Sequence, residues 1–496
     1  MKRYSKSDIS NIYSILKTSA EKSFRRGKNY DSLIFIKTAA SWMSQFNAFY
    51  SDAEVDALLQ KIAKQTFIEK KIEKPSAQKC ILIDSWGWDH KGLSQQYING
   101  LINAGLEILY ICTRKDENRG SDIQASLKDC GRAEFVYVDS KKNALEAAKI
   151  IRNRIVDFSP SAIFLHINPY DTAALMACSE LGGIKIFNIN LTDHAFWLGS
   201  SLIDYNIEFR PYGMTVSQEK RALRQEQILP LPYYPIKSLS HPFQGLPTLP
   251  QNAIKVFTGG ALYKMLGKED IFFKIMESVL KISSNVYILV AGFNKEQIFE
   301  EKCKKLYGNE RILQIGNRSD IDEVFEHIDI YLSTYPMIGG LMSQYAAMHG
   351  KPIIAYHEKG DIMNEVEEII NNFQQSFHSC TNISDMIEYA TKLIQDINFR
   401  QAEGKTLKEG LMTPQRFDDM LSYYYKNQTS KLNWEKDEIN YDSFFERYLE
   451  LENNSGFKAT EDLVAKLKWK ALFSLKGYRL NLLEKMLFLS YKKIVN

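Results

Sequence analysis

The sequence is poor in cysteine and contains neither a low-complexity tract nor a long apolar run. Only six of its 496 residues are cysteines, and no two of them form a C-x-x-C pair. Neither a disulfide framework nor a zinc site is therefore expected. No apolar run approaches the roughly 18 residues that a membrane-spanning helix needs, and the polar N-terminus lacks the apolar core of a signal peptide. These absences predict a reduced, cytoplasmic protein.

A strong net charge and two common nucleotide-binding fingerprints are also missing. The formal net charge is only +3, so no broad basic field points to a nucleic-acid partner. No G-x-G-x-x-G occurs where a dinucleotide fingerprint would be expected, which counts against a dehydrogenase. Gly267-Lys268 is followed by Glu269, and the glycine spacing is wrong for a Walker A loop.

Two series of strands that alternate with helices are present instead, after a helical start. Residues 1–75 carry apolar residues at helical spacing and no strand signal. Strands are then expected at 80–84, 108–112, 134–138, 162–166 and 184–189. A second series has strands at 255–257, 286–291 and 312–315 and two more that begin at Asp329 and Pro352. Such alternation predicts an α/β protein with a parallel, doubly wound sheet in each half.

A cluster of six prolines between residues 229 and 250 separates the two series. Because so many backbone donors are missing there, no helix or central strand is expected, and the stretch is interpreted as a stiff linker. The predicted organisation has four parts: a helical N-terminal region (1–75), a first α/β domain (76–240), a second α/β domain (250–395), and crossover helices with a C-terminal tail (396–496).

Two glycine pairs in the second domain carry the main functional signal. The segment from Asp329 to Tyr356 reads as strand, Gly339-Gly340 turn, helix and strand, and Gly259-Gly260 follows an earlier strand. Free backbone N–H groups and the positive end of a helix dipole at such a turn suit a phosphate. The alternative is a tight turn with no ligand. Lys264, just beyond the first pair, is the residue best suited to neutralise a diphosphate leaving group, and Lys268 is a weaker candidate.

Polar and aromatic residues gather where strands of the first domain end, which is where ligands of such sheets bind. They include Trp86, Asp89, His90, His166 and the pair Asp193-His194, with Trp197 close behind. A histidine can take a proton from a hydroxyl near pH 7, and an aspartate can do so or fix the imidazole tautomer. Alternatively, Thr192 or Asp193 caps a helix and both His194 and His166 are structural.

The order and spacing of these segments resemble the GT-B glycosyltransferases. Leu262-Tyr263-Lys264 resembles the O-GlcNAc transferase family, in which the lysine holds the donor diphosphate, and the segment from Pro336 to Ala355 resembles the donor loop and helix of that family and of family 4. Over residues 78 to 400 the chain looks like bacterial enzymes of capsule and exopolysaccharide assembly. The resemblance implies two Rossmann-like domains facing a cleft, the first for the acceptor and the second for a nucleotide sugar.

The chain departs from these families in the donor loop. Met337 and Tyr345 stand where family-4 enzymes carry two glutamates, and Tyr345 also replaces a ribose-binding aspartate of the O-GlcNAc transferases. Gln344 or Ser343 is expected to contact the ribose instead, with Asp361 or Glu365 approaching from the next loop. This loss leaves the donor sugar and the stereochemistry of transfer open.

No metal or other cofactor is expected. Asp320-Ile321-Asp322 resembles the metal motif of another glycosyltransferase fold, but Ser319 and Asp322 read as a capping pair at the start of a helix. The donor charge would then be met by Lys264, Arg318 and the amides of Gly339 and Gly340. Transfer is therefore predicted to be metal-independent.

The tail from residue 465 to 495 interleaves leucines and aromatics with lysines. Such a basic amphipathic stretch either packs on the domain with its lysines in water or lies on the inner face of the cell membrane. The function expected from all these features is hexosyl transfer from a UDP-sugar to a hydroxyl of a glycan or lipid-linked acceptor in surface polysaccharide (capsule) biosynthesis. A nucleotide-sugar 2-epimerase and a non-catalytic GT-B subunit are the alternatives.

Overall fold

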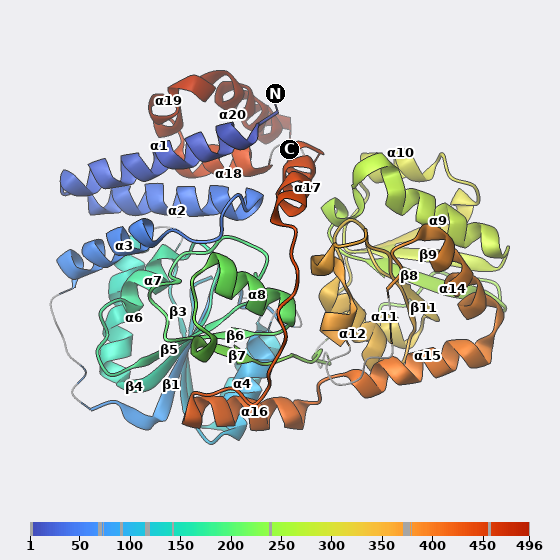
Figure 1. Cartoon of the computed structure of the whole chain (residues 1–496), viewed down its shortest axis with the longest axis horizontal. Coiled ribbons are helices and arrows are strands. Elements are labelled where there is room, and N and C mark those ends of the chain that lie inside the picture. The colour runs from blue at the N-terminus through green and yellow to red at the C-terminus, as the bar shows by residue number, and fades with distance from the viewer. Residues whose placement is uncertain are drawn as a thin grey trace. The chain divides into compact units, whose positions relative to one another are not determined.

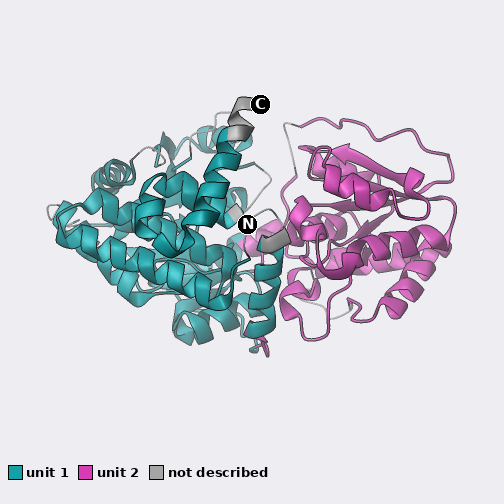
Figure 2. Cartoon of the chain, turned by 90° about the horizontal axis from the view of Figure 1, so that it is seen from above, with its two compact units in different colours: residues 1–231, 418–436, 442–496 teal, residues 232–417, 437–441 magenta. Residues whose placement is uncertain are grey.

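The computed structural model describes residues 3–67, 72, 74–89, 93–114, 120–140, 143–237, 241–370, 377, 379–454 and 458–495. The chain divides into two compact units, which Figure 2 shows in different colours. Unit 1 comprises Met1–Leu231, Asp418–Lys436 and Asp442–Asn496, and unit 2 comprises Pro232–Phe417 and Asp437–Tyr441. The boundaries thus fall at the start of the proline cluster and about twenty residues beyond the position that the sequence suggested for the crossover.

Unit 1 is built on a seven-stranded sheet whose paired strands all run parallel, in the order β3-β2-β1-β4-β5-β6-β7. The first five strands lie where the sequence predicted them, and the last two were not predicted. β6 is short, and every second residue in it, Asn206 and Glu208, is polar. β7 ends in Pro230, which only an edge strand tolerates. The strands are β1 (Ser76–Asp84), β2 (Glu107–Cys112), β3 (Ala133–Tyr137), β4 (Pro160–His166), β5 (Lys185–Ile189), β6 (Tyr205–Glu208) and β7 (Ile228–Pro230).

Helices connect these strands, and the N-cap side chain caps the start of two of them. Asn143 accepts hydrogen bonds from the amides of Leu145 and Glu146 at the start of α6, and Asp171 accepts one from the amide of Ala174 at the start of α7. The helices are α4 (Ser94–Asn103), α5 (Ser121–Cys130), α6 (Ala144–Phe158), α7 (Thr172–Cys178) and α8 (Pro211–Lys220).

The two ends of the chain join in one helical layer of unit 1 (Figure 1), which the sequence had separated into a cap and a tail. The Tyr4 hydroxyl lies 2.9 Å from Thr460 Oγ1, and Lys466 Nζ donates to Ser41 Oγ at 2.7 Å. The helices are α1 (Lys6–Arg25), α2 (Asn29–Phe46), α3 (Ala53–Thr66), α17 (Tyr441–Asn454), α18 (Lys458–Leu467), α19 (Lys470–Ser474) and α20 (Arg479–Val495). In the part of the chain that the structure describes, no helix is both long and apolar enough to cross a bilayer.

Unit 2 contains a five-stranded parallel sheet in the order β10-β9-β8-β11-β12. Alternate strand residues enter two apolar clusters: Val256 and Ile330 belong to one and Phe257 and Tyr331 to the other, as expected for a sheet covered on both faces. The strands are β8 (Ile254–Gly259), β9 (Val286–Ala291), β10 (Ile312–Gly316), β11 (Ile330–Leu332) and β12 (Ile353–Ile354). The helices are α9 (Ile271–Ile282), α10 (Gln297–Cys303), α11 (Ile321–Glu326), α12 (Gly340–Met348), α13 (Glu367–Ile370), α14 (Ile383–Gln395) and α15 (Ile397–Gly410).

The chain returns to unit 1 within α16 (Pro414–Asn427). The hydroxyl of Tyr424 donates to the carbonyl of Pro230 at 2.6 Å, and that of Tyr425 donates to the carbonyl of Ala77 at 2.7 Å. These two tyrosines therefore attach the helix to unit 1.

Candidate functional site

The Gly339-Gly340 turn of unit 2 leads directly into α12. A Cβ atom at Gly339 would lie 2.7 Å from the Tyr331 hydroxyl, and one at Gly340 would lie 2.9 Å from Ile369 Cδ1, so a side chain at either position would displace its neighbour. The first intrahelical bond runs from the amide of Ser343 to the carbonyl of Gly339 at 2.8 Å. Helix geometry leaves the amides of the preceding residues without intrahelical acceptors. The turn can therefore present N–H donors and the positive helix end to an anion.

Lys264 lies beside this turn. It sits in the 3₁₀ turn Leu262–Met265, directly after β8 and its glycine pair. Its Nζ donates to the carbonyl of Ile338, the residue before Gly339, at 2.9 Å. A Cβ at Gly260 would lie 3.4 Å from Lys264 Cδ, so the glycine leaves room for the lysine stem. The structure therefore brings together the two features that the sequence singled out, through a bond between residues 74 positions apart.

The Lys264 ammonium carries a charge that its surroundings do not neutralise. Among the described residues no carboxylate pairs with it, and its only hydrogen bond is to a neutral carbonyl. Burial lowers the pKa of Lys264 to about 8. A partly buried cation beside free amides is an arrangement that an anion would stabilise.

The loop before the turn is held by Asn364, which the sequence did not single out. Its Oδ1 accepts from the amide of Ile338 at 3.0 Å, and its Nδ2 donates to the carbonyl of Pro336 and to Asp361 Oδ2, both at 2.8 Å. Asp361, expected near the ribose, thus orients the asparagine that fixes the loop. Asn364 precedes Glu365, which the sequence placed near the ribose, but an asparagine there gives no signal of its own in a single sequence.

The first glycine pair shapes the site without offering its second amide. Gly259 ends β8, and the amide of Gly260 donates to the carbonyl of Ala291 at 3.1 Å, so it is not free for a phosphate. A Cβ at Gly292 would lie 2.3 Å from the Gly260 oxygen. The two neighbouring turns therefore approach each other closely, and the glycines provide space more than hydrogen bonds.

Arg318 is engaged elsewhere, which contradicts its expected role with the donor. Its Nε and Nη2 bind Asp320 at 2.7 and 2.6 Å, and its Nη1 donates to the carbonyl of Gly245 at 2.7 Å. Asp320 also accepts from the amide of Gln244 at 2.7 Å. This buried bidentate pair attaches the linker to unit 2.

The same region corrects the expected capping pair. Ser319 Oγ accepts from the Gln244 side chain at 3.0 Å instead of capping α11, which has Asp320 as its N-cap and no side-chain cap. Asp322 lies 2.7 Å from His349 Nε2. Both aspartates of the Asp-x-Asp sequence are thus committed to protein partners.

Gln344 and Tyr345 also face the linker and not open space. Gln344 is fully buried, and its Nε2 donates to the carbonyls of Tyr233 at 3.0 Å and Ile369 at 3.3 Å. The Tyr345 hydroxyl donates to the carbonyl of Ile236 at 2.7 Å. The expected ribose contact by Gln344 is therefore not favoured, because its amide nitrogen already binds the carbonyls of Tyr233 and Ile369.

In unit 1, the Asp193-His194 pair lies in a turn after β5, with no helix for either residue to cap. His194 Nδ1 lies 3.1 Å from Asp193 Oδ1. Its ring stacks on Tyr448 of α17 with centroids 6.1 Å apart and planes 5° apart. The His194 side chain is 32% exposed, and its Nε2 has no partner among the described residues. The imidazole is therefore oriented on one side and open on the other, as a general base requires.

Asp193 itself cannot serve as the base. Its Oδ2 accepts from Arg210 Nε at 2.5 Å, and it is almost fully buried. Burial acts to raise the pKa of Asp193, but Arg210 and the bond to His194 outweigh it and hold that pKa well below its usual range. Arg221 fixes the same turn by donating to the carbonyls of Asp193 and Ala195 at 2.7 and 2.6 Å. Asp193 is a residue that positions His194.

His166, the other expected base, is completely buried at the end of β4. Its Nδ1 lies 3.2 Å from both Asp84 Oδ1 and Ser94 Oγ. Burial acts to raise the pKa of Asp84, but His166 and the hydroxyls of Ser94 and Tyr110 lower it. The Asp84 carboxylate also accepts from the amides of Trp86 at 2.7 Å and Gly87 at 3.1 Å. His166 therefore supports the loop after β1 and is not exposed to a substrate.

The expected acceptor-side residues separate into three groups. Trp86 lines a cavity of unit 1. Asp89 accepts from Ser121 Oγ and from the amides of Asp122 and Ile123 at 2.9 to 3.1 Å, so it caps the start of α5 and its acceptor role is corrected. Trp197 is buried, with Arg221 stacked 4.9 Å from its ring centroid, and is likewise structural. His90 lies outside the described residues.

Comparison with solved structures gives the fold a name. The match to the O-GlcNAc transferase of Thermobaculum terrenum, in a point-mutant form, covers 90% of this chain and 85% of the transferase chain. The two are 13% identical, and the TM-score is 0.50. TarM covers 71% of this chain and 98% of its own at 9% identity, also with a TM-score of 0.50. HepE of Anabaena, solved with UDP and glucose, covers 71% of this chain and all of its own at 11% identity, with a TM-score of 0.48. The chain has the GT-B fold.

The GT-B fold is shown by structure alone, since no family model and no curated protein matches the sequence. It agrees with the strand orders of both units, in which the first strand lies next to the second and the fourth. In this GT-B chain the donor-loop positions that carry acidic residues in the resembling families hold the largely buried Met337 and Tyr345. The residues that sequence reasoning missed are Asn364 in unit 2 and Arg210, Arg221 and Tyr448 in unit 1.

Proposed function

We propose that this chain is a glycosyltransferase that moves a sugar from a nucleotide diphosphate donor, a UDP-sugar, to a hydroxyl of a glycan or lipid-linked acceptor in surface polysaccharide synthesis. The observation that carries the proposal is the position of Lys264, whose ammonium lies on the carbonyl preceding the Gly339-Gly340 turn. A GT-B fold and an unneutralised cation beside free helix amides together suit the diphosphate of such a donor.

The proposed chemistry assigns one role to each unit. In unit 2, Lys264 and the first amides of α12 receive the diphosphate as the bond between the anomeric carbon and the phosphate oxygen breaks and its electron pair moves to that oxygen. In unit 1, His194 Nε2 takes the proton of the acceptor hydroxyl while the hydroxyl oxygen bonds to the anomeric carbon. The Asp193 carboxylate supports the imidazolium that forms.

The proposal needs no metal ion for the donor charge. Lys264 supplies one full positive charge and α12 the positive end of its dipole, and Asp320 and Asp322 are already bound to Arg318 and His349. A metal dependence of transfer, measured by assaying with and without a chelator, would contradict this part.

We further propose that α19 and α20 touch an anionic membrane surface. These helices pack on unit 1 through residues such as Leu475 and Leu482, yet leave Phe473, Leu480 and Leu487 each at least 70% exposed. The exposed Lys476 and Arg479 lie between those apolar side chains in sequence. An apolar face with adjacent cations matches the boundary of a bilayer rich in acidic lipids.

The deciding experiment is calorimetry of the full chain with UDP and UDP-sugars, followed by product analysis with a hydroxyl acceptor. Micromolar binding and formation of a new glycosidic bond are expected. An altered UDP-sugar without transfer would show the epimerase instead. Absence of any UDP binding would favour the non-catalytic subunit, an outcome that the missing donor-loop carboxylates make worth testing.

A further inference from the structure

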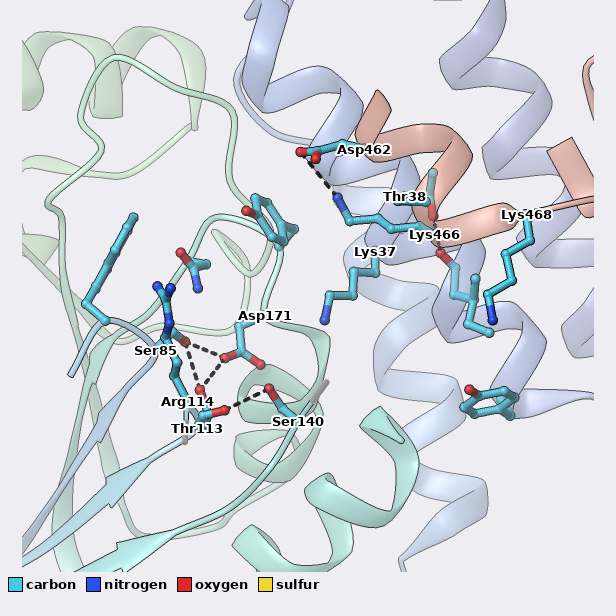
Figure 3. A pocket seen from close by; sticks show the side chains of 16 residues that line it. Lys37, Thr38, Ser85, Thr113, Arg114, Ser140, Asp171, Asp462, Lys466 and Lys468 are labelled. Atoms are coloured by element: carbon cyan, nitrogen blue, oxygen red, sulfur yellow. Dashed lines mark hydrogen bonds and ion pairs between the residues drawn. The ribbon is translucent and has the colours of Figure 1, made fainter. Parts of the chain in front are cut away.

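A cavity of about 670 Å³ opens in unit 1 between the sheet and the helical layer formed by the two chain ends. Ser85, Thr113 and Asp171, which follow β1, β2 and β4, line one side. The other side is lined by Lys37 of α2 and Lys466 of α18, as Figure 3 shows. This volume suits a ligand of one or two sugar rings. Because the lining comes from both chain ends and the sheet, only the folded unit creates it.

Cations outnumber available carboxylates in this cavity. Lys37, Arg114 and Lys468 have no acidic partner among the described residues, and Figure 3 shows Lys37 reaching from its helix into the cavity. Within the described part of the chain, the Asp171 carboxylate accepts only from neutral donors, namely Ser85 Oγ, Thr113 Oγ1 at 3.1 Å and the amide of Ala174, so it keeps its negative charge. The four cations of the lining still exceed its two carboxylates. Asp462 offsets Lys466 alone, at 3.7 Å.

Lys466, the most enclosed of these cations, has a pKa that reflects both burial and the excess of positive charge. Burial lowers the pKa of Lys466, and the nearby charge of Lys37 lowers it further, while Asp462 only partly restores it. Two ammonium groups therefore oppose each other at the wall of a partly enclosed space, where charges are poorly screened. An anion bound between them would relieve this repulsion.

The remaining lining adds groups that suit the rest of a ligand. Trp86 and Tyr170 offer aromatic surface, and Asn168 offers both a donor and an acceptor. Lys466 Nζ lies 5.1 Å from the Tyr170 ring centroid, so a cation and an aromatic face adjoin each other.

From these observations we infer that the cavity binds a small organic phosphate, with Lys37, Arg114 and Lys466 around the phosphate group. The inference concerns unit 1 alone and does not depend on the proposed transfer reaction or on the donor position in unit 2. It assigns a function to the helices at the two chain ends, which complete the cavity that the sheet begins.

The test is calorimetry of the full chain with glucose 1-phosphate, glycerol 3-phosphate and unphosphorylated glucose. We expect at least one phosphate ester to bind and glucose to bind at least about tenfold more weakly, because charge-assisted contacts dominate. The ester with the higher affinity shows whether the part of the ligand that carries the phosphate is a sugar or a polyol. Higher salt should weaken binding of the ester.

Matched variants locate the bound phosphate. Lys37→Ala should weaken binding about tenfold or more, as loss of one charge-assisted contact predicts, and Arg114→Gln provides a second, independent removal of charge. Lys61→Ala is the control, since Lys61 is an exposed lysine of α3 that does not line this cavity. Lys264→Ala should bind the ester like the wild type, because its site is in unit 2.

Three results would overturn the inference. The first is that neither ester binds, and the second is that glucose binds as tightly as glucose 1-phosphate. The third is that Lys264→Ala abolishes binding while Lys37→Ala and Arg114→Gln leave it unchanged, which would place the phosphate in the donor site. The third result would support the proposed function while removing this inference, so the two proposals fail separately.

Discussion

Replacing Lys264 by alanine tests the central electrostatic proposal, because the affinity for UDP should fall while the stability of the ligand-free protein should hardly change. The ammonium donates one hydrogen bond, to the Ile338 carbonyl at 2.9 Å, and has no carboxylate partner among the described residues. Its loss should therefore cost the ligand-free protein little. Binding of UDP should suffer much more, because the variant lacks the only full charge assigned to the diphosphate.

The magnitude follows from the kind of contact removed. A hydrogen bond between charged groups contributes about 1.5–3 kcal/mol, which corresponds to a dissociation constant for UDP raised about 10- to 100-fold. The loss of the ammonium's bond to a carbonyl and the removal of a partly buried cation act in opposite directions on folding. The melting temperature of the ligand-free variant should accordingly stay within a few degrees of the wild type, while the extra stabilisation by UDP should shrink.

The pH dependence gives a sharper signature. With a pKa of about 8, Lys264 is about 90% protonated at pH 7 and about 10% protonated at pH 9 in the free protein. Since the charged form binds the diphosphate, affinity for UDP should fall about tenfold between these pH values. Lys264→Ala should show no such fall, and Lys264→Arg should bind with a flat profile because arginine stays charged.

Lys268→Ala is the matched control, because Lys268 is an exposed neighbour of the same loop, with its side chain 66% exposed and only 3.9 Å from Glu269. Calorimetry and thermal unfolding of the four proteins at pH 7 and pH 9 provide the measurements. Equal UDP affinity of wild type and Lys264→Ala would refute the reasoning. So would an equal effect of Lys268→Ala, since the surface charge alone would then explain binding.

Three further predictions concern other parts of the chain. Burial raises the pKa of Glu208 to about 7 from 4.5, so the free energy of unfolding should fall by about 3 kcal/mol as the pH rises from about 4.5 to about 7. In urea titrations, Glu208→Gln should lose most of this pH dependence of stability. An unchanged pH dependence would refute the assignment. His194→Gln should lower kcat about 10²- to 10⁴-fold with UDP affinity unchanged, and a normal kcat would exclude His194 as the base. Leu480→Ser combined with Leu487→Ser should abolish sedimentation with phosphatidylglycerol vesicles, whereas a wild-type level of binding, or equal binding to phosphatidylcholine vesicles, would contradict the proposed membrane contact.

Local sequence patterns were sufficient for the alternating elements, for a reason visible in particular strands. Residues 80–83 and 286–291 are continuous apolar runs, as strands buried on both faces must be, and the glycine pairs at the end of β8 and the start of α12 mark tight turns. These signals depend on a few neighbouring residues. β6 and β7 escaped prediction because Glu208 and Pro230 are unusual residues for a sheet, and only their buried partners make them acceptable there.

Functional residues were less predictable, because their roles depend on partners far along the chain. Arg318 and Gln344 read as donor ligands in isolation, yet both are bound to the linker. His166 and Asp89 read as acceptor residues, yet one binds Asp84 and the other starts α5. A polar residue at a strand end is equally suited to a ligand and to a protein partner, and sequence spacing does not distinguish them.

The sequence by itself determined the two α/β halves, the proline-rich connection and the lysine that follows the first glycine pair, since each is written in consecutive residues. The tertiary structure alone decided that Lys264 bonds Ile338, 74 positions later and next to the glycine turn. It also decided that Asp193 is held by Arg210 while His194 stays open, and that the two chain ends close a cationic cavity over the first sheet. The physical reason is that charge and burial are properties of neighbours in space, and only folding determines which residues those neighbours are.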